Sequence, residues 1–189
     1  MKTSCIQLPT YMGNDIIWLK KKVGDIVTTI TPPKKLLSSD YQKKGKYPII
    51  DQSQDYICGY SDDESALINI ISEGVIIFGD HTCILKYVDF PFIQGADGIK
   101  ILRSSNPDQI DIRYLYQFLL YSPVVSKEYK RHFSELKEIM VVYPDSIEYQ
   151  WKLAEIFFSL DREIELMVSK TDLLAQYKKG MMQQLFPII

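Results

Sequence analysis

Cysteine and histidine are scarce in this chain, which contains only three cysteines and two histidines among its 189 residues. Cys5, Cys58 and Cys83 are odd in number, widely separated and form no Cys-x-x-Cys pair. Such a pattern predicts neither a disulfide framework nor a zinc site. We therefore expect a reducing, cytoplasmic environment and a protein that carries no metal and no other cofactor.

Long apolar runs are also absent. The N-terminus lacks a charged segment followed by an apolar run, and no apolar stretch approaches the ~20 residues that a membrane-spanning helix needs. Neither a secretion signal nor a membrane span is predicted. The sequence shows no internal repeat and no low-complexity tract, and apolar residues make up 46% of it, enough for one hydrophobic core. These observations predict a single mixed fold.

The chain has little net charge, but positive charge is concentrated in one segment. The formal net charge is −2 and the pI is about 5.7, which argues against binding of polyanions over the whole surface. Residues 20–46, however, contain eight lysines against two aspartates, a local charge of +6, so the remainder carries −8. Any anion-binding face must therefore be local.

Catalytic signatures are weak. His81 follows Asp80, and a histidine beside a carboxylate can serve as a general base. However, the chain has one other histidine and no nucleophile in a recognisable elbow, and adjacent residues on a strand point to opposite faces. We therefore interpret residues 78–82 as a polar loop tip, suited to hydrogen bonding with a ligand edge such as a nucleobase.

Aspartates are numerous enough to raise a metal-dependent nuclease as an alternative. None of their spacings matches the Asp-then-Glu-x-Lys arrangement that such sites need, so most are interpreted as solvated turn residues. Gly95 and Gly98 lack the spacing of a phosphate-binding loop and are interpreted as turn residues. The sequence therefore predicts no catalytic residue.

Short apolar runs separated by polar turns predict a β-rich region. An amphipathic turn at residues 18–23 is expected to lead into the first strand. Pro32 and Pro33 end that strand, and residues 34–46 are expected to form a long, solvent-facing loop. The runs that predict this region are residues 26–30, 47–50, 56–58, 75–78, 83–88, 99–102 and 138–143.

Two helical segments are predicted before the last of these runs. An apolar stripe with helical spacing runs from Ile112 to Leu120 and predicts a helix that ends before Pro123. A second, shorter helix is expected at residues 125–133. Residues 144–146 mark a domain boundary, with Ser146 or Asp145 as the N-cap of a long helix and Glu148 placed to complete a capping box.

The strongest pattern is a heptad repeat that extends from residue 149 to residue 186 without a proline. One set of residues recurs every seven places and a second set follows four places later, as in a coiled-coil seam. At 1.5 Å per residue the helix would be on the order of 50 Å long, so we expect it to project and to need a partner helix. The predicted seam consists of Leu153, Phe157, Leu160, Ile164, Met167, Thr171, Leu174, Lys178, Met181 and Leu185.

Tyrosines and glutamines are interleaved with the lysines of residues 34–46 and follow them closely. A lysine run is most often a solvated face, but this mixture suits phosphate positioning combined with reading of base edges. The residues predicted to contact phosphates are Lys34, Lys35, Lys43, Lys44 and Lys46. The residues predicted to read bases are Gln52, Gln54, Asp80, His81, Thr82 and Gln94.

Short motifs spread over nearly the whole chain carry a family resemblance. They are Trp18 with Val23-Gly24-Asp25-Ile26, and residues 45–50, 57–60, 78–82, 95–98, 132–137 and 178–186. Together they resemble one half of the specificity subunit of a type I restriction-modification system. In that family, target-recognition domains open with Trp and Leu-Gly-Asp-Ile and contain a Phe-Ser-x-Leu-Lys segment.

The resemblance implies an α+β fold. A β-rich target-recognition domain with flanking helices would occupy residues 1–145, and one long coiled-coil helix would occupy residues 146–189. It also implies sequence-specific binding of double-stranded DNA without catalysis by this chain. Assembly with methyltransferase subunits, and through them with restriction subunits, would direct adenine methylation and cleavage to the bound sequence.

The chain departs from the family because a full specificity subunit carries two recognition domains and two long helices, whereas these residues supply one of each. We therefore expect self-association through the long helix and recognition of an interrupted palindromic site, with pairing to a different half-subunit as the other possibility. Two alternatives stay open. One is a non-catalytic coiled-coil adaptor or silent specificity cassette without DNA binding. The other, ranked far lower, is a magnesium-dependent nuclease that uses Asp80 and His81.

Overall fold

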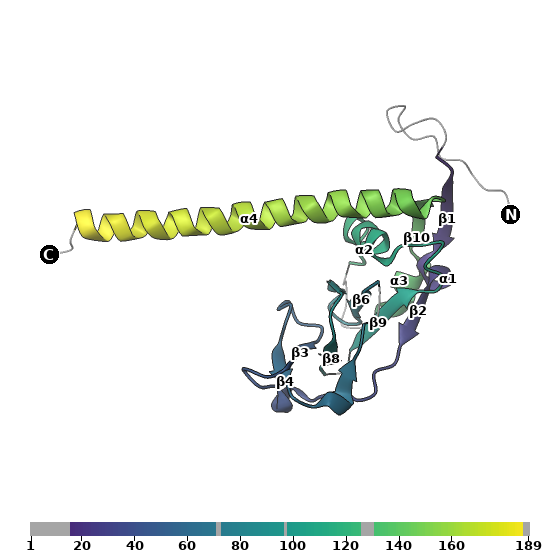
Figure 1. The fold of residues 1–189 in the computed structure, drawn as a ribbon, viewed down its shortest axis with the longest axis horizontal. Helices are drawn as coiled ribbons and strands as arrows, with labels where there is room; N and C mark the ends of the chain where they lie inside the picture. The colour runs from purple at the N-terminus through teal and green to yellow at the C-terminus, as the bar shows by residue number, and fades with distance from the viewer. Residues whose placement is uncertain (1–15, 71–72, 97, 126–130, 187–189) are drawn as a thin grey trace. The chain divides into compact units, whose positions relative to one another are not determined.

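The structure, a computed structural model, describes residues 16–70, 73–96, 98–125 and 131–186. It has the predicted α+β class, with strands and short helices followed by a long C-terminal helix (Figure 1). The chain divides into two compact units between Trp151 and Lys152. We refer to the first as the globular unit and to the second as the helical unit.

One sheet of the globular unit is four-stranded and antiparallel throughout. Its strand order is β2-β9-β6-β7. The strands are β2 (Val27–Ile30), β9 (Ile99–Ser104), β6 (Val75–Gly79) and β7 (Leu85–Val88). Every residue of β6 is buried, as expected of an inner strand whose sequence is a continuous apolar run.

The second sheet is four-stranded and mixed, with the order β4-β3-β8-β5. Its strands are β4 (Gly59–Ser61), β3 (Tyr47–Ile50), β8 (Phe92–Gln94) and β5 (Leu67–Ile68). The β3–β8 pair is parallel and starts at Ile49, one residue after Pro48, so the proline faces β4 alone. This register accommodates a residue that has no backbone N–H.

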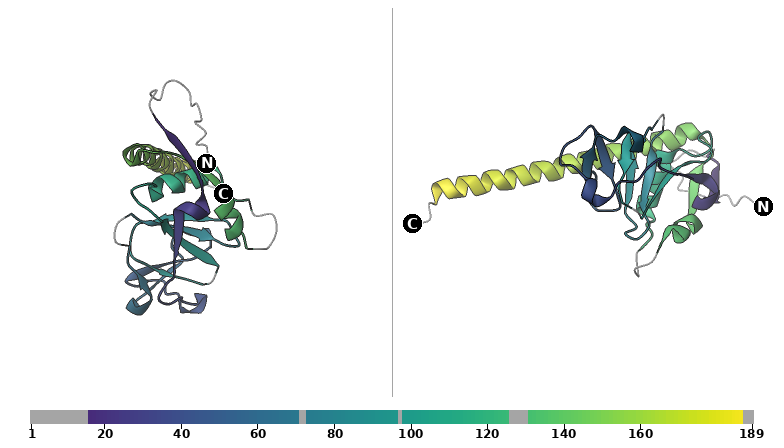
Figure 2. Two further views of the ribbon diagram at one scale, coloured as in Figure 1. Left: turned by 90° about the vertical axis from the view of Figure 1, so that its right-hand side faces the viewer. Right: turned by 90° about the horizontal axis from the view of Figure 1, so that it is seen from below.

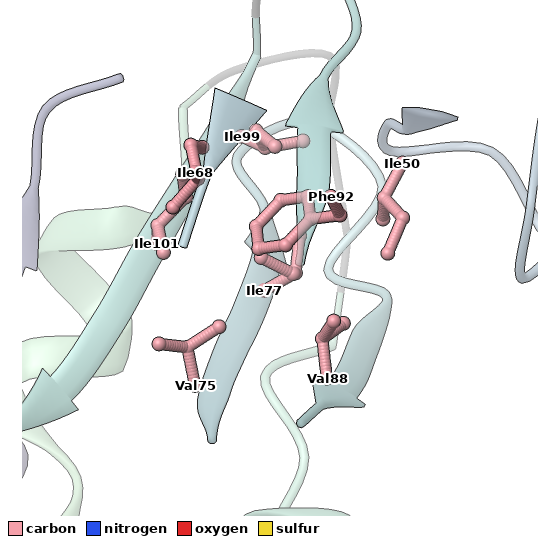
Figure 3. Packing of buried hydrophobic residues seen from close by; sticks show 8 residues of the cluster. All are labelled: Ile50, Ile68, Val75, Ile77, Val88, Phe92, Ile99 and Ile101. Atoms are coloured by element: carbon pink, nitrogen blue, oxygen red, sulfur yellow. The ribbon is translucent and has the colours of Figure 1, made fainter. Parts of the chain in front are cut away.

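The main hydrophobic core combines residues of both sheets (Figure 3). Its members are Ile50, Ile68, Val75, Ile77, Val88, Phe92, Ile99 and Ile101. A smaller cluster contains Leu36, Ile49, Ala66 and Ile93. Because Ile49 and Ile50 are neighbours on β3, their side chains point to opposite faces, and each cluster takes one of them. Figure 2 shows the same strands in two further views.

A two-stranded ribbon joins the two ends of the globular unit. Strand β1 (Trp18–Lys22) pairs with β10 (Met140–Pro144), and the one-turn helix α1 (Val23–Ile26) packs against α3 (Phe133–Glu138). The amphipathic turn predicted at residues 18–23 is therefore wrong, because β10 supplies a strand partner that local sequence does not reveal. The strand predicted at residues 26–30 is confirmed as β2, beginning one residue later.

Three other predicted elements differ from the structure. Residues 56–58 are not a strand, and the nearest one is β4. The two short strands β5 and β8 were not predicted. The strand predicted at residues 138–143 is found as β10, shifted toward Pro144. Much of the helix predicted at residues 125–133 lies outside the described residues, and α3 begins only at Phe133.

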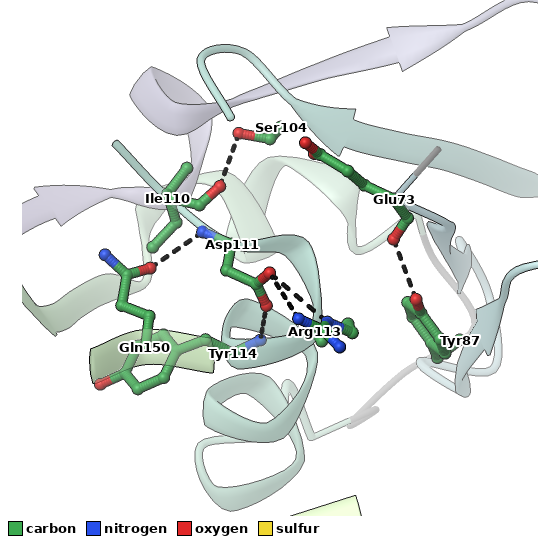
Figure 4. A network of polar contacts seen from close by, with 8 residues as sticks. All are labelled: Glu73, Tyr87, Ser104, Ile110, Asp111, Arg113, Tyr114 and Gln150. Carbon is green, nitrogen blue, oxygen red and sulfur yellow. Dashed lines mark hydrogen bonds and ion pairs between the residues drawn. The ribbon is translucent and has the colours of Figure 1, made fainter. Parts of the chain in front are cut away.

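Helix α2 (Ile112–Tyr121) confirms the predicted apolar stripe and packs on β6 and β7. The Asp111 carboxylate caps it by accepting a hydrogen bond from the Tyr114 N–H at 2.8 Å. Buried Gln150 accepts from the Asp111 N–H at 2.8 Å (Figure 4). Its amide nitrogen also donates to the carbonyls of Gln109 and Pro144 at 2.9 and 2.8 Å. This glutamine therefore ties the first turn of the last helix, within the globular unit, to the start of α2 and the end of β10.

Helix α4 (Ile147–Leu185) spans 39 residues, as the heptad pattern predicts. The Tyr149 N–H donates to the Ser146 hydroxyl at 3.3 Å, which makes Ser146 the N-cap. In the helical unit, Leu160, Met167 and Leu174 expose 52%, 63% and 58% of their surface. Among the described residues, no helix is both long enough and apolar enough to cross a membrane.

Candidate nucleic-acid interface

Loop 51–58, between β3 and β4, is organised around the Asp51 carboxylate. One oxygen accepts hydrogen bonds from the Ser53 N–H at 2.8 Å and the Cys58 thiol at 2.9 Å, and the other accepts from the Tyr41 hydroxyl at 3.2 Å. Partial burial raises the pKa of Asp51, but these hydrogen bonds outweigh it and leave the pKa below its ordinary value. Asp51 is therefore the ionised centre of the loop.

Lys86, on β7, holds the same loop through its backbone carbonyls. Its ammonium group donates to the carbonyl oxygens of Asp51 at 2.8 Å and Asp55 at 2.6 Å. The residue is only 4% exposed, and this burial lowers the pKa of the ammonium group. Lys86 therefore holds the backbone of loop 51–58 and has almost no contact with solvent.

Tyr41 ties the basic segment 34–46 to two other loops. Its hydroxyl accepts from the Ala96 N–H at 2.8 Å and donates to Asp51. Burial raises the pKa of Tyr41 to about 12, so the phenol stays protonated and can donate. A side chain at Gly95 would collide with the Tyr41 hydroxyl, so only glycine permits this approach.

Gln52 and Thr82 join loop 51–58 to the turn that follows β6. The Thr82 hydroxyl donates to the Gln52 carbonyl at 2.9 Å. The Gln52 side chain lies against Gly98, whose φ of 99° favours glycine, and a Cβ there would come within 2.7 Å of the Gln52 amide nitrogen. We call residues 51–58, 79–84, 94–96 and 98 the loop cluster.

The loop cluster presents some predicted base-reading residues and hides others. Gln54 and Thr82 are exposed, and Gln52 and His81 are half-buried. Asp80 and Gln94 are buried, which corrects their expected place at the surface. The Asp80 carboxylate accepts from the Phe133 N–H at 2.9 Å and caps the start of α3. We therefore assign Asp80 and Gln94 structural roles.

The five predicted phosphate-contacting lysines also differ from one another. All are exposed, but Lys34 is held by Asp63 at 2.7 Å, and the Lys46 ammonium lies 4.8 Å above the Tyr47 ring. Lys35, Lys43 and Lys44 are exposed on the same segment. The segment is not wholly solvent-facing as expected, because Leu36 is buried in the smaller core cluster.

The loop cluster therefore offers amides, a hydroxyl and an imidazole beside a lysine-rich segment. Such groups donate to and accept from base edges, whereas ammonium groups pair with phosphates. Within the ranges that the structure describes, no group of three or more His, Cys, Asp or Glu side chains is placed to hold a metal ion.

Sequence reasoning missed the three residues that organise the site. Asp51 and Tyr41 look like ordinary polar residues of a loop, and nothing in their spacing indicates that they meet. Lys86 had a signal: it shares a strand face with Val88 inside an apolar run, so the alternation predicts an inward-pointing lysine. A lysine at such a position needs acceptors, and the loop carbonyls supply them.

The sequence model of the family described as type I restriction modification DNA specificity domain matches residues 16–176. The specificity subunit of the type I restriction enzyme EcoR124I/EcoR124II of Escherichia coli is 28% identical over 175 residues. The match covers 88% of this chain and 43% of that subunit.

Solved structures share the fold. The S subunit of a type I restriction-modification system from M. genitalium has a TM-score of 0.65 at 16% identity, covering 93% of this chain and 47% of that one. The HsdS subunit from Thermoanaerobacter tengcongensis has a TM-score of 0.52 at 14% identity, covering 85% and 40%. The chain thus spans less than half the length of each of these relatives.

Proposed function

Because this chain belongs to the type I restriction-modification DNA specificity domain family, we propose that it recognises a specific DNA sequence for a type I complex. The observation that carries the proposal is the loop cluster, where Gln52, Gln54 and Thr82 gather beside exposed lysines. In this proposal the chain performs no catalysis. Methyltransferase subunits, and restriction subunits bound through them, act on the sequence that it selects.

The residues divide into two roles. Lys34, Lys35, Lys43, Lys44 and Lys46 contact phosphates and so contribute affinity for any duplex, although the partner of Lys34 in the free chain, Asp63, must first be displaced. The residues that read base edges are Gln52, Gln54, His81 and Thr82. Asp80 and Gln94, which were also predicted to read bases, are left out because they are buried.

The helical unit supports self-association. Its predicted seam is exposed: Phe157, Leu160, Ile164, Met167, Leu174, Met181 and Leu185 each leave 38% to 65% of their surface accessible. A second copy packed antiparallel would bury this seam and relate two loop clusters by a two-fold axis. The dimer would read identical, inverted half-sites separated by a fixed spacer, and would direct adenine methylation there.

Selection from randomised duplexes tests this function. The full chain, assembled with a methyltransferase subunit encoded beside it, is incubated with a pool of random DNA, and the retained duplexes are sequenced. We expect one enriched sequence with a non-specific spacer, and none with the methyltransferase subunit alone. Assembly without any enriched sequence would reject the proposal in favour of a coiled-coil adaptor, a role that the exposed seam also fits. Cleavage of DNA by the pure chain with magnesium would instead support a nuclease.

A further inference from the structure

Loop 51–58 carries two of the proposed base-reading side chains, Gln52 and Gln54, yet none of its residues lies in a strand or helix. Holding irregular backbone in one conformation opposes its conformational entropy, so contacts from neighbouring elements must fix it. Reading a base edge depends on where the amide is held. The contacts that fix this loop therefore bear on sequence selectivity.

Lys86 makes the least expected of these contacts. Burying an ammonium group is unfavourable unless hydrogen bonds compensate, and Lys86 finds its compensation in two carbonyls of the loop, those of Asp51 and Asp55. Val88, two residues along the same strand face, belongs to the hydrophobic core. An apolar residue at position 86 would pack on that face without the desolvation penalty, so the lysine serves the loop rather than the sheet.

Further contacts also support the loop. The Asp51 carboxylate closes the loop on itself through Ser53 and Cys58. Tyr41 links that carboxylate to the lysine-rich segment, and Thr82 holds the carbonyl of Gln52. The Tyr56 hydroxyl also donates to the carbonyl of Tyr87 on β7, and the Cys58 N–H donates to the carbonyl of Ile49 on β3. Lys86 differs from these contacts because one buried side chain on β7 donates to two carbonyls of the loop.

We infer that Lys86 is a positioning residue for sequence selectivity, which holds loop 51–58, the loop that carries Gln52 and exposed Gln54, in one conformation. This inference rests on the proposed DNA recognition and adds to it a residue that does not contact DNA. Its consequence separates two lysines of the same chain. Exposed Lys44 sets affinity for every duplex, whereas buried Lys86 sets the preference among duplexes.

The test makes the same substitution at both positions, Lys86→Met and Lys44→Met, in the full chain assembled with the methyltransferase subunit. Affinity is measured for the duplex selected by the wild type and for that duplex with one half-site base pair changed, over a series of salt concentrations. We expect Lys86→Met to reduce the ratio of the two affinities by about tenfold and to leave the salt dependence unchanged. Lys44→Met should weaken both duplexes equally and reduce the salt slope by about one.

Hydrogen exchange gives a readout that does not depend on DNA. The amides of Ser53 and Cys58, which donate to Asp51 and to the Ile49 carbonyl, should exchange faster in Lys86→Met and at the wild-type rate in Lys44→Met. If Lys86→Met does not fold, Tyr41→Phe removes one hydroxyl from the same network, retains the ring and should also lower the affinity ratio.

Several outcomes would overturn the inference. A folded Lys86→Met variant with an unchanged affinity ratio would do so, as would one that loses affinity equally for both duplexes, which a merely structural role predicts. A wild-type complex that prefers no duplex would overturn the proposed function, and the inference with it. Because the wild type alone reveals a failure of the proposed function, that failure can be distinguished from a failure of the inference about Lys86.

Discussion

The globular unit and the helical unit treat their apolar side chains in opposite ways. In the globular unit, Ile76, Ile93 and Leu102 are fully buried. In the helical unit, Leu160 and Leu174 expose more than half of their surface. The first unit therefore contains its own hydrophobic core, whereas the second gains one only when another helix covers it.

The two units also differ in what their polar residues do. In the globular unit, polar groups such as Asp51 and Lys86 hold one another and the backbone. In the described part of the helical unit, polar side chains are exposed on a regular helix. In the proposed function, the globular unit recognises DNA and the helix provides spacing and association, a division that the following variants challenge.

The largest effect should come from placing charge in the helical seam. Leu160→Asp combined with Leu174→Asp should weaken self-association by at least about 100-fold, because carboxylates would have to be buried between helices. Sedimentation velocity over a concentration series measures it. Ser169→Asp, outside the seam, is the matched control and should leave association unchanged. A double variant that still dimerises would show that the seam is not the interface.

A cavity in the core of the globular unit should lower the stability of that unit. Ile77→Ala removes a buried side chain of the main core and should lower the free energy of unfolding by about 2–5 kcal/mol, measured by denaturant titration. Ile164→Ala, whose side chain is 59% exposed on the helix, should leave the unfolding of the globular unit unchanged. Equal losses in both variants would mean that the two units unfold as one.

A charge deletion should distinguish the units as DNA-binding surfaces. Lys43→Met with Lys44→Met should weaken binding to every duplex by roughly tenfold and reduce the salt slope by about two, since two phosphate contacts are lost. Lys152→Met with Lys170→Met makes the same change of charge on the helix and should leave the slope unchanged. Filter binding at several salt concentrations measures both. A slope that responds only to the helix pair would contradict the assignment.

The smallest effect concerns Cys58. Burial raises the pKa of its thiol, and its hydrogen bond to Asp51 raises the pKa further. At pH 8 the folded chain should therefore hold less thiolate, and react more slowly with iodoacetamide, than the unfolded chain. Asp51→Asn removes the neighbouring charge and should speed alkylation several-fold. The measurement uses a Cys5→Ser, Cys83→Ser background, and equal rates in folded and unfolded chains would contradict the account of loop 51–58.

Elements governed by local pattern could be predicted from the sequence. The apolar run of β6, the stripe of α2 and the heptads of α4 each encode their structure within a few residues. Strand β1 could not be predicted in this way, because its partner β10 lies at the other end of the globular unit. Its three lysines resemble a solvated turn until β10 is beside them.

The candidate site shows the same limit. The sequence placed Gln52, Gln54 and Thr82 in polar loops, and the structure brings these loops together. The sequence did not reveal that Asp80 turns inward to cap α3. A carboxylate in a polar motif looks like a ligand contact until its backbone partner is known. Tertiary hydrogen bonds, which have no sequence period, decide which polar residues face outward.

The most direct test of the central claim is a map of methylated adenines in a host that expresses the full chain with the methyltransferase subunit encoded beside it. The account predicts one interrupted, palindromic motif that disappears when Leu160→Asp and Leu174→Asp are introduced. An asymmetric motif would contradict pairing of two identical copies. No new methylation from an assembled complex would contradict DNA recognition by the loop cluster altogether.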